Sequence, residues 1–265
     1  MKKSNPDRYR IKVLEKALRI LELFGGKDRE FTATEISETL GLNKASTFRI
    51  LSNLEEADFV EKDGETAKYS LGIKVYYLGR CAEPHTKLKK IARPFLVALN
   101  RKCGETVHLA VLHQGEALYL DKIEGNRTIR VISQVGAKLP AHCSGVGKAL
   151  LAALPGEQLE EVIRGKGLRR FTEKTITDLE KLRRELAKFR ERGYTIDNEE
   201  IEEGLKCVAA PILGSNGETL AAISISAPSE RFNGASPLFV SEVKDTAAKI
   251  SAALRTHMEA GKVLP

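Results

Sequence analysis

The residues of this chain most able to do chemistry are a histidine, two cysteines and an aspartate in its second half. His142 and Cys143 are adjacent, and Asp197 and Cys207 follow downstream. A thiol activated by a histidine is the nucleophile of many hydrolases, which makes a Cys-His hydrolase conceivable. Adjacent residues on one backbone rarely face each other well enough for proton transfer, and the chain contains no G-x-S-x-G elbow. We therefore predict no catalytic residues, with the hydrolase as the alternative.

Metal binding by the same four residues is a second possibility, because histidine, cysteine and aspartate all suit zinc. Their positions lack the spacing that is typical of zinc sites. The four cysteines form no C-x-x-C pair, which excludes zinc ribbons and thioredoxin-like motifs. We predict neither a bound metal nor a cofactor.

A glycine-rich loop, HCSGVGK, spans residues 142–148 and leads into a predicted helix. Backbone amides at a helix start bind anions, and Gly145 and Gly147 would let a small ligand approach the backbone closely. A Walker motif is excluded, because His142 stands where its first glycine belongs and Ala149 follows the lysine. The spacing is compatible with either a simple turn or a ligand contact.

A strand near the C-terminus carries hydroxyl groups on one face. Side chains alternate along a strand, so Ser224 and Ser226 share a face with Ala222. Hydroxyls on a face expected to be apolar indicate either a lined cavity or a solvent-facing edge. Asp197 and Cys207 flank other short strands. Taken alone, their residue types favour a turn cap and a small buried hydrophobe over ligand groups.

A second region with functional residue types lies near the N-terminus, within residues 31–61. Thr32 and Glu35 form a capping-box pattern for one helix, Gly41 ends it, and Asn43 is a good cap for the next. The second helix begins with small and cationic residues, which are types that reach phosphates and base edges. The residues predicted to contact DNA are Thr34, Lys44, Ala45, Ser46, Thr47 and Arg49, with Lys62 and Lys68 on the segment that follows.

The spacing of apolar residues predicts the elements that position this DNA-contacting helix start, here called the reader. The side chains of Phe48, Leu51 and Leu54 are expected to face the core from the second helix. A preceding helix over 11–24 is predicted from an apolar stripe, which consists of Val13, Leu14, Ala17, Leu18, Leu21 and Phe24. Asp63-Gly64 between two strand-like runs predicts a hairpin, and three helices with a hairpin make a winged helix. Gly72–Cys81 is too apolar for a flexible linker, and a helix that packs against a copy of itself explains this.

The remainder of the chain predicts an α+β domain with a central antiparallel sheet. The strand-like runs are Thr106–Leu112, Ala117–Ile123, Thr128–Val135, Tyr194–Ile196, Cys207–Leu213 and Thr219–Ser226. Helices are predicted at about 85–103, 157–164, 179–192 and 237–258.

Composition sets broad limits on function. The chain has 265 residues, a net charge of +7 and a pI near 9.1, which permits a polyanionic partner without requiring one. No apolar run approaches the ~18–20 residues that cross a bilayer, and the N-terminus lacks a signal-peptide core. We expect a cytoplasmic protein with no membrane partner.

The order of these motifs resembles the IclR family of bacterial transcriptional regulators, from about Val13 to Met258. The resemblance rests on LNKASTFRILSNLEEADFVE, CGETVHLAVL, GAKLPAHCSGVGKALLA and RGYTIDNEE…GLKCVAAPI. It implies a winged helix-turn-helix over residues 1–72, a linker helix over 73–84 that is used in dimerisation, and a GAF-like effector-binding domain over 85–265. It also implies dimers that often pair into tetramers.

The same resemblance points to an effector site. The motif-matched residues are Gly145, Val146, Asp197, Cys207, Ser224 and Ser226, and Leu139 and Leu205 are expected in the apolar wall. Val146 stands where the family often has alanine, which narrows or reshapes the pocket. Asp197 would repel an anion unless it accepts a hydrogen bond or is protonated.

We therefore predict a ligand-responsive transcription factor, more a repressor than an activator. Its partners would be a near-palindromic DNA operator, a small carboxylate or aromatic acid, and further copies of itself as a homodimer or tetramer. The alternative is a hydrolytic enzyme that uses Cys and His, in which the winged helix is an accessory interaction module.

Overall fold

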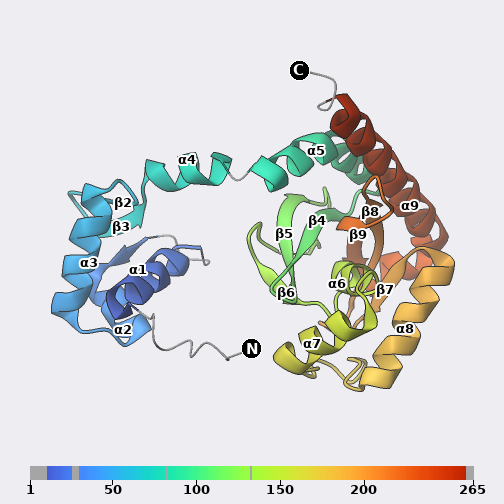
Figure 1. Ribbon diagram of the computed structural model, residues 1–265, viewed down its shortest axis with the longest axis horizontal. Helices are drawn as coiled ribbons and strands as arrows, with labels where there is room; N and C mark the ends of the chain where they lie inside the picture. The colour runs from blue at the N-terminus through green and yellow to red at the C-terminus, as the bar shows by residue number, and fades with distance from the viewer. Residues whose placement is uncertain (1–10, 26–29, 82, 132, 261–265) are drawn as a thin grey trace, which may run out of the picture. The chain divides into compact units, whose positions relative to one another are not determined.

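The computed structural model describes residues 11–25, 30–81, 83–131 and 133–260. The chain divides into two compact units, Met1–Thr86 and Lys87–Pro265 (Figure 1). The N-terminal residues 1–10, which we expect to be frayed, lie outside the described residues. None of the helices within the described ranges is long and apolar enough to span a membrane.

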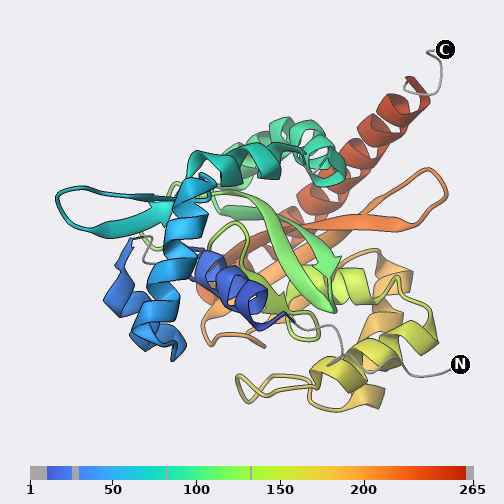
Figure 2. The same cartoon turned by 60° about the vertical axis from the view of Figure 1, so that its left-hand side comes forward.

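The first unit combines three helices with a small antiparallel sheet in the order β1-β3-β2. Its elements are α1 (Lys12–Leu23), β1 (Phe31–Thr32), α2 (Ala33–Leu40), α3 (Lys44–Glu56), β2 (Val60–Lys62) and β3 (Lys68–Leu71). The predicted hairpin is β2–β3, which Figure 2 shows extending away from the helices of this unit. The two-residue strand β1 was too short to leave a sequence pattern.

Local capping signals position the helices of this unit as the sequence predicts. The Thr32 hydroxyl accepts a hydrogen bond from the Glu35 amide, and the Glu35 carboxylate accepts one from the Thr32 amide, which completes the capping box. Gly41 ends α2 in the left-handed conformation at φ 63°. The Asn43 side chain caps α3 by accepting bonds from the amides of Ala45 and Ser46.

The predicted inward faces of α1 and α3 are partly wrong. Val13, Leu14 and Leu18 are exposed in the single chain, whereas Ile20 and Phe24 are buried. The predicted stripe covered more than one face of α1, and packing selected the face that meets α2 and α3.

In α3 the inward face is rotated from the predicted one. Phe48 is 54% exposed and Ile50 is buried in its place, whereas Leu51 is buried and Leu54 packs against the same core, as predicted. Thr47 is the neighbour of Ile50 and Leu51 on the buried side of the helix.

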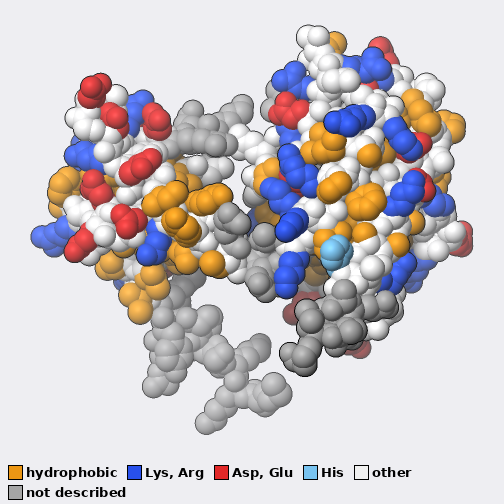
Figure 3. Space-filling model, turned by 90° about the horizontal axis from the view of Figure 1, so that it is seen from above, with side chains coloured by type: hydrophobic (Ala, Val, Ile, Leu, Met, Phe, Trp, Pro, Cys, Tyr) orange, Lys and Arg blue, Asp and Glu red, His pale blue; other side chains and the backbone are white. Residues whose placement is uncertain are grey.

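Two helices follow the wing, α4 (Ile73–Cys81) and α5 (Glu83–Cys103). Ile73, Tyr77 and Leu78 of α4 are exposed although they are large and apolar. Figure 3 shows hydrophobic side chains gathered on the surface of the first unit. An unburied apolar surface of this kind is typical of a surface that another chain covers.

The second unit is built on a six-stranded, fully antiparallel sheet in the order β6-β5-β4-β9-β8-β7. Its strands are β4 (Thr106–His113), β5 (Glu116–Ile123), β6 (Lys138–Pro140), β7 (Thr195–Asn198), β8 (Leu205–Leu213) and β9 (Thr219–Pro228). The strand bearing Ser224 and Ser226 is β9, which lies in the centre, so the solvent-facing edge is excluded.

Helices cover both faces of this sheet (Figure 1). Apolar side chains of α5 and of α9 (Ser229–Ala260) pack with one face, and those of α6 (Gly145–Leu151), α7 (Gly156–Lys166) and α8 (Leu179–Arg192) pack with the other. The last helix begins before the predicted start, and Pro237 lies inside it.

The predicted strand Thr128–Val135 is wrong. The free edge of β5 pairs with β6 instead, and Leu118 lies opposite Lys138. The described residues of 124–136 form no strand. Their β-branched side chains gave a strand-like pattern, but no neighbouring strand offers them a ladder of hydrogen bonds.

Candidate functional sites

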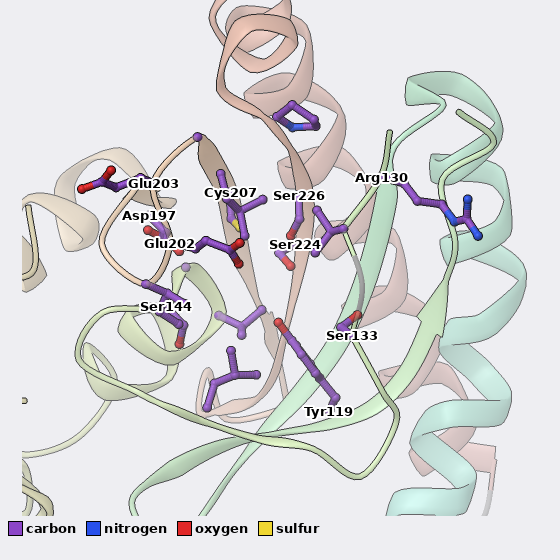
Figure 4. A pocket seen from close by; sticks show the side chains of 18 residues that line it. Tyr119, Arg130, Ser133, Ser144, Asp197, Glu202, Glu203, Cys207, Ser224 and Ser226 are labelled. Carbon is purple, nitrogen blue, oxygen red and sulfur yellow. The ribbon is translucent and has the colours of Figure 1, made fainter. Parts of the chain in front are cut away.

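A cavity of about 340 Å³ lies against the central strands of the second unit (Figure 4). All the residues predicted for the effector site line it: Leu139, Gly145, Val146, Asp197, Leu205, Cys207, Ser224 and Ser226. They come from β6, α6, β7, β8 and β9. The fold therefore brings together residues that are far apart in the sequence, and their contact with an effector stays a prediction.

The register of three strands explains how the polar residues meet. Asp197 of β7 lies opposite Cys207 of β8, and Cys207 lies opposite Ser226 of β9. Residues directly opposite each other in an antiparallel sheet share a face. One row across the sheet thus presents a carboxyl, a thiol and a hydroxyl to the cavity.

Glycines in the HCSGVGK loop allow α6 to pack closely. A Cβ on Gly147 would lie 2.4 Å from the backbone of Ala141, so a larger residue does not fit. A Cβ on Gly145 would lie 3.3 Å from the Cβ of Cys207, which is tight. The Ser144 hydroxyl caps α6 by accepting a bond from the Gly147 amide. That amide is therefore not available to a ligand, while contact of Gly145 and Val146 with a ligand stays a prediction.

Further cavity residues were missed by the sequence reasoning: Tyr119, Arg130, Val131, Ser133, Ser144, Ile201, Glu202, Glu203, Gly204 and Pro228. Tyr119 reaches the cavity face because β4 and β5 shift register between Leu109 and Ala110. No local pattern reveals such a shift.

A buried histidine lies beside the two serines on the same face of the sheet. His108 of β4 stacks on the ring of Tyr119 at 4.3 Å between centroids, and its Nε2 lies 2.7 Å from the Ser133 hydroxyl. Its Nδ1 lies 3.5 Å from the hydroxyl of Ser224 and 3.4 Å from that of Ser226. Burial, with Lys122 nearby, lowers the pKa of His108 to about 3, so the ring is neutral. His108 thus fixes the two serines without adding charge.

A buried ion pair lies behind Asp197. Lys148, 1% exposed, donates hydrogen bonds to the Glu200 carboxylate and to the Ile196 carbonyl. The Glu200 amide in turn donates to the Asp197 carboxyl at 2.8 Å. Desolvation raises the pKa of Glu200, and it raises the pKa of Asp197 to about 7. The lysine of the HCSGVGK loop therefore holds the β7 turn in place and does not line the cavity.

The hydrolase alternative finds no support in the geometry. The His142 ring bonds the Arg169 carbonyl, and the Cys143 thiol contacts the Pro140 carbonyl. Burial raises the pKa of Cys143 to about 12 and also raises the pKa of Cys207. Both thiols are therefore protonated at neutral pH and are poor nucleophiles. Within the described ranges, no group of His, Cys, Asp and Glu is arranged to hold a metal ion.

The start of α3 carries the predicted DNA contacts in the first unit. Lys44, Ala45 and Arg49 are exposed and Ser46 is half-buried. Thr34 of α2 is exposed as well. A cationic and hydroxyl-bearing helix start that is open to solvent has the chemistry of a recognition helix.

The structure corrects the predicted DNA contact of Thr47. Its side chain is 0% exposed, and its hydroxyl donates to the Asn43 carbonyl. A residue buried beneath its own helix start cannot reach a base edge. Phe48 is exposed instead, because the core contacts the side of α3 that carries Thr47, Ile50 and Leu51.

The wing supplies two further cations. Lys62 is exposed on β2, with its ammonium 5.5 Å from the centre of the Tyr69 ring. Lys68 on β3 is half-buried, and its positive charge helps to lower the pKa of Glu35 after two hydrogen bonds from Thr32. Lys62 therefore has the freer geometry for a phosphate contact.

Two family models match this chain. The one described as the IclR helix-turn-helix domain matches residues 13–64, and the one described as the bacterial transcriptional regulator IclR C-terminal domain matches residues 82–252. The HTH-type transcriptional repressor AllR of Salmonella typhi is 37% identical over 244 residues, which cover 91% of this chain and 89% of the relative. The HTH-type transcriptional regulator XynR of Escherichia coli (strain K12) is 34% identical over 225 residues, or 85% and 89% of the two chains.

Solved structures give the same grouping. An IclR homolog from Microbacterium hydrocarbonoxydans, complexed with 4-hydroxybenzoate, superposes with a TM-score of 0.83 at 29% identity and covers 92% of this chain and 100% of that one. The IclR of Thermotoga maritima superposes with a TM-score of 0.71 at 31% identity, covering 91% and 100%.

Proposed function

This chain belongs to the IclR family and is a ligand-responsive, DNA-binding transcriptional regulator, and we propose that it represses transcription as a dimer on a near-palindromic operator. Residues 1–72 would bind DNA, 73–84 would link the two functions, and 85–265 would bind the effector. Repression is favoured by the likeness to a named repressor, AllR.

The observation that carries the proposal is the cavity against β9. Residues predicted from separate motifs line one space, and two hydroxyls and a carboxyl face it. Such a space, apolar with a few convergent polar groups, is the usual form of a small-molecule site. The related structure that holds 4-hydroxybenzoate supports a small organic effector here.

The proposed dimer rests on the apolar surface of α4. Ile73, Tyr77 and Leu78 are exposed on this helix, and a second copy would bury them. Two-fold symmetry would then present two recognition helices to two half-sites of an operator. The substitution Tyr77→Glu should reduce the mass of the assembly in sedimentation, and an unchanged mass would place the interface elsewhere.

A cavity-filling variant tests ligand control. Ser226→Met fills part of the cavity from its inner wall, and Ser215→Met makes the same change in an exposed turn. Both variants should bind the DNA upstream of the gene that encodes this protein, as measured by fluorescence anisotropy. Metabolite extract that releases the wild type and Ser215→Met should fail to release Ser226→Met. Equal release of all three would show that the effector acts outside this cavity.

The same assay tests DNA recognition. A regulator of this kind binds its operator much more tightly than random DNA of equal length at the same salt concentration. Equal affinity for both would refute sequence-specific regulation. Because non-specific affinity is salt-dependent, both DNAs must be titrated in the same buffer.

A further inference from the structure

The HCSGVGK loop borders two separate cavities. Ser144, Gly145 and Val146 line the cavity against β9, in which the effector is proposed to bind. His142, at the start of the same loop, lines a second cavity of about 200 Å³. The proposed function therefore accounts for the later residues of the loop and gives His142 no role.

The walls of the second cavity are mainly apolar. They come from β6, α6, α7 and the segment that follows α7, and the apolar lining residues are Pro140, Ala141, Leu151, Val162, Ile163 and Phe171. An apolar cavity of about 150 Å³ in another protein is large enough to bind benzene. The second cavity thus has room for a ligand of one aromatic ring.

The charged residues of this cavity lie at its exposed mouth. The Lys166 ammonium, on a side chain that is 41% exposed, lies 2.8 Å from the Glu116 carboxylate, so these two charges offset each other. Arg169 is exposed, and its guanidinium lies 5.2 Å from the centre of the Phe171 ring. Charges in contact with water are screened and select weakly between ligands. The polar group that matters inside the cavity is therefore His142.

The hydrogen bond of His142 defines which of its nitrogens carries the proton. His142 is 4% exposed, and its Nε2 lies 3.0 Å from the Arg169 carbonyl oxygen. A carbonyl oxygen only accepts, so Nε2 is the donor. Burial lowers the pKa of His142, which keeps the ring neutral at neutral pH. In this tautomer Nδ1 is a hydrogen-bond acceptor.

The Nδ1 atom of His142 has no hydrogen-bond partner among the residues that the structure describes. Within the same residues, the polar side-chain atom that is fully buried without a partner is a carboxylate oxygen of Glu200. Nδ1 is therefore accessible, and His142 lines the second cavity. An acceptor left unpaired in an apolar site is costly, so a ligand that supplies a donor is favoured over one that does not.

We propose that this cavity is a second small-molecule site, which takes an uncharged molecule of about one aromatic ring whose O–H or N–H group donates to Nδ1 of His142. The ring would pack among Leu151, Val162 and Phe171. This goes beyond the proposed function, because neither DNA binding nor the cavity against β9 uses His142.

Cavity-filling variants test the location of the site. Phenol is the probe, and its binding to the full chain is measured by calorimetry at millimolar ligand and neutral pH. Val162→Phe fills the second cavity from α7, and Ser226→Met fills the cavity against β9. Phenol should bind the wild type and Ser226→Met alike, and Val162→Phe at least ~10-fold more weakly. No binding to the wild type, equal binding to Val162→Phe, or an equal loss in Ser226→Met would overturn the proposal.

A second pair of variants tests the donor to His142. Toluene replaces the phenol hydroxyl with a methyl group of similar size. His142→Phe keeps an aromatic ring but removes the acceptor, and should lower the phenol-to-toluene affinity ratio by at least ~10-fold. His113→Phe makes the same change at an exposed position of β4 and should leave the ratio unchanged. A ratio that survives His142→Phe contradicts the role of His142.

A crystal structure of the wild type with phenol decides the matter if Val162→Phe or His142→Phe does not fold, as judged by circular dichroism. The phenol oxygen should lie within hydrogen-bond distance of Nδ1 of His142. An empty second cavity, or a ring whose oxygen points elsewhere, would refute the site as described.

Discussion

The two units use their functional residues in opposite ways. In the first, Lys44 and Arg49 stand exposed on one helix start, with their local structure fixed by the Asn43 cap. In the second, Asp197 and Ser226 are buried, and three strands must be in register before they meet. The difference indicates that the reader can change its contacts without altering its fold, whereas the cavity is part of its own domain's core.

Breaking the ion pair behind the cavity should have the largest effect. Lys148→Met leaves the Glu200 carboxylate buried without its partner, which should lower the free energy of unfolding of the second unit by about 3–5 kcal/mol. Urea denaturation followed by circular dichroism measures it. The double variant Lys148→Met/Glu200→Leu removes both charges and should recover most of the loss. Equal losses in the single and double variants would refute this account.

A change on the exposed reader should affect binding and leave the fold unaltered. Arg49→Ala should weaken operator binding by about 1–3 kcal/mol if Arg49 reads a base, with an unchanged melting temperature. Arg164→Ala, at an exposed position of α7, is the control for lost charge. Anisotropy titrations compare the three proteins, and unchanged affinity for Arg49→Ala would remove it from the reader.

Substitution of Thr47 should give the smallest effect of the three. Thr47 lies in the predicted DNA-binding helix, but its side chain is buried like those that line the cavity. Thr47→Val keeps the shape and removes the hydroxyl that bonds the Asn43 carbonyl. Stability of the first unit should fall by about 1 kcal/mol, with operator affinity nearly unchanged. Ser46→Ala, at the half-buried neighbour, is the matched comparison. A selective loss of affinity in Thr47→Val would restore Thr47 to the DNA contacts.

The sequence was most informative where a signal is local. The capping box at Thr32 and Glu35 and the caps at Gly41 and Asn43 depend on residues within four positions, and the structure confirms them. Strand alternation likewise placed Ser224 and Ser226 on one face. Resemblance to the family identified the other cavity residues, which no local pattern would have joined.

Errors arose where neighbours decide the outcome. The face of α3 that is buried depends on where the core meets it, so Thr47 and Phe48 were exchanged. Thr128–Val135 has strand-forming residues but no strand beside it. His108 was missed because it lies in an apolar run. Its even spacing with Thr106 and Ala110 on β4 was the available sign that it faces the serines across the sheet.

Strand β9 separates two environments by the thickness of one backbone. Ser224 and Ser226 face the cavity, and Ile223 and Ile225 on the opposite side pack in the core that contains α5 and α9. A molecule that pushes the serines by a fraction of an ångström therefore displaces the isoleucines as well, since interiors are close-packed and have no slack to absorb the shift. The strand that borders the proposed effector cavity is thus also part of the core against which α5 packs.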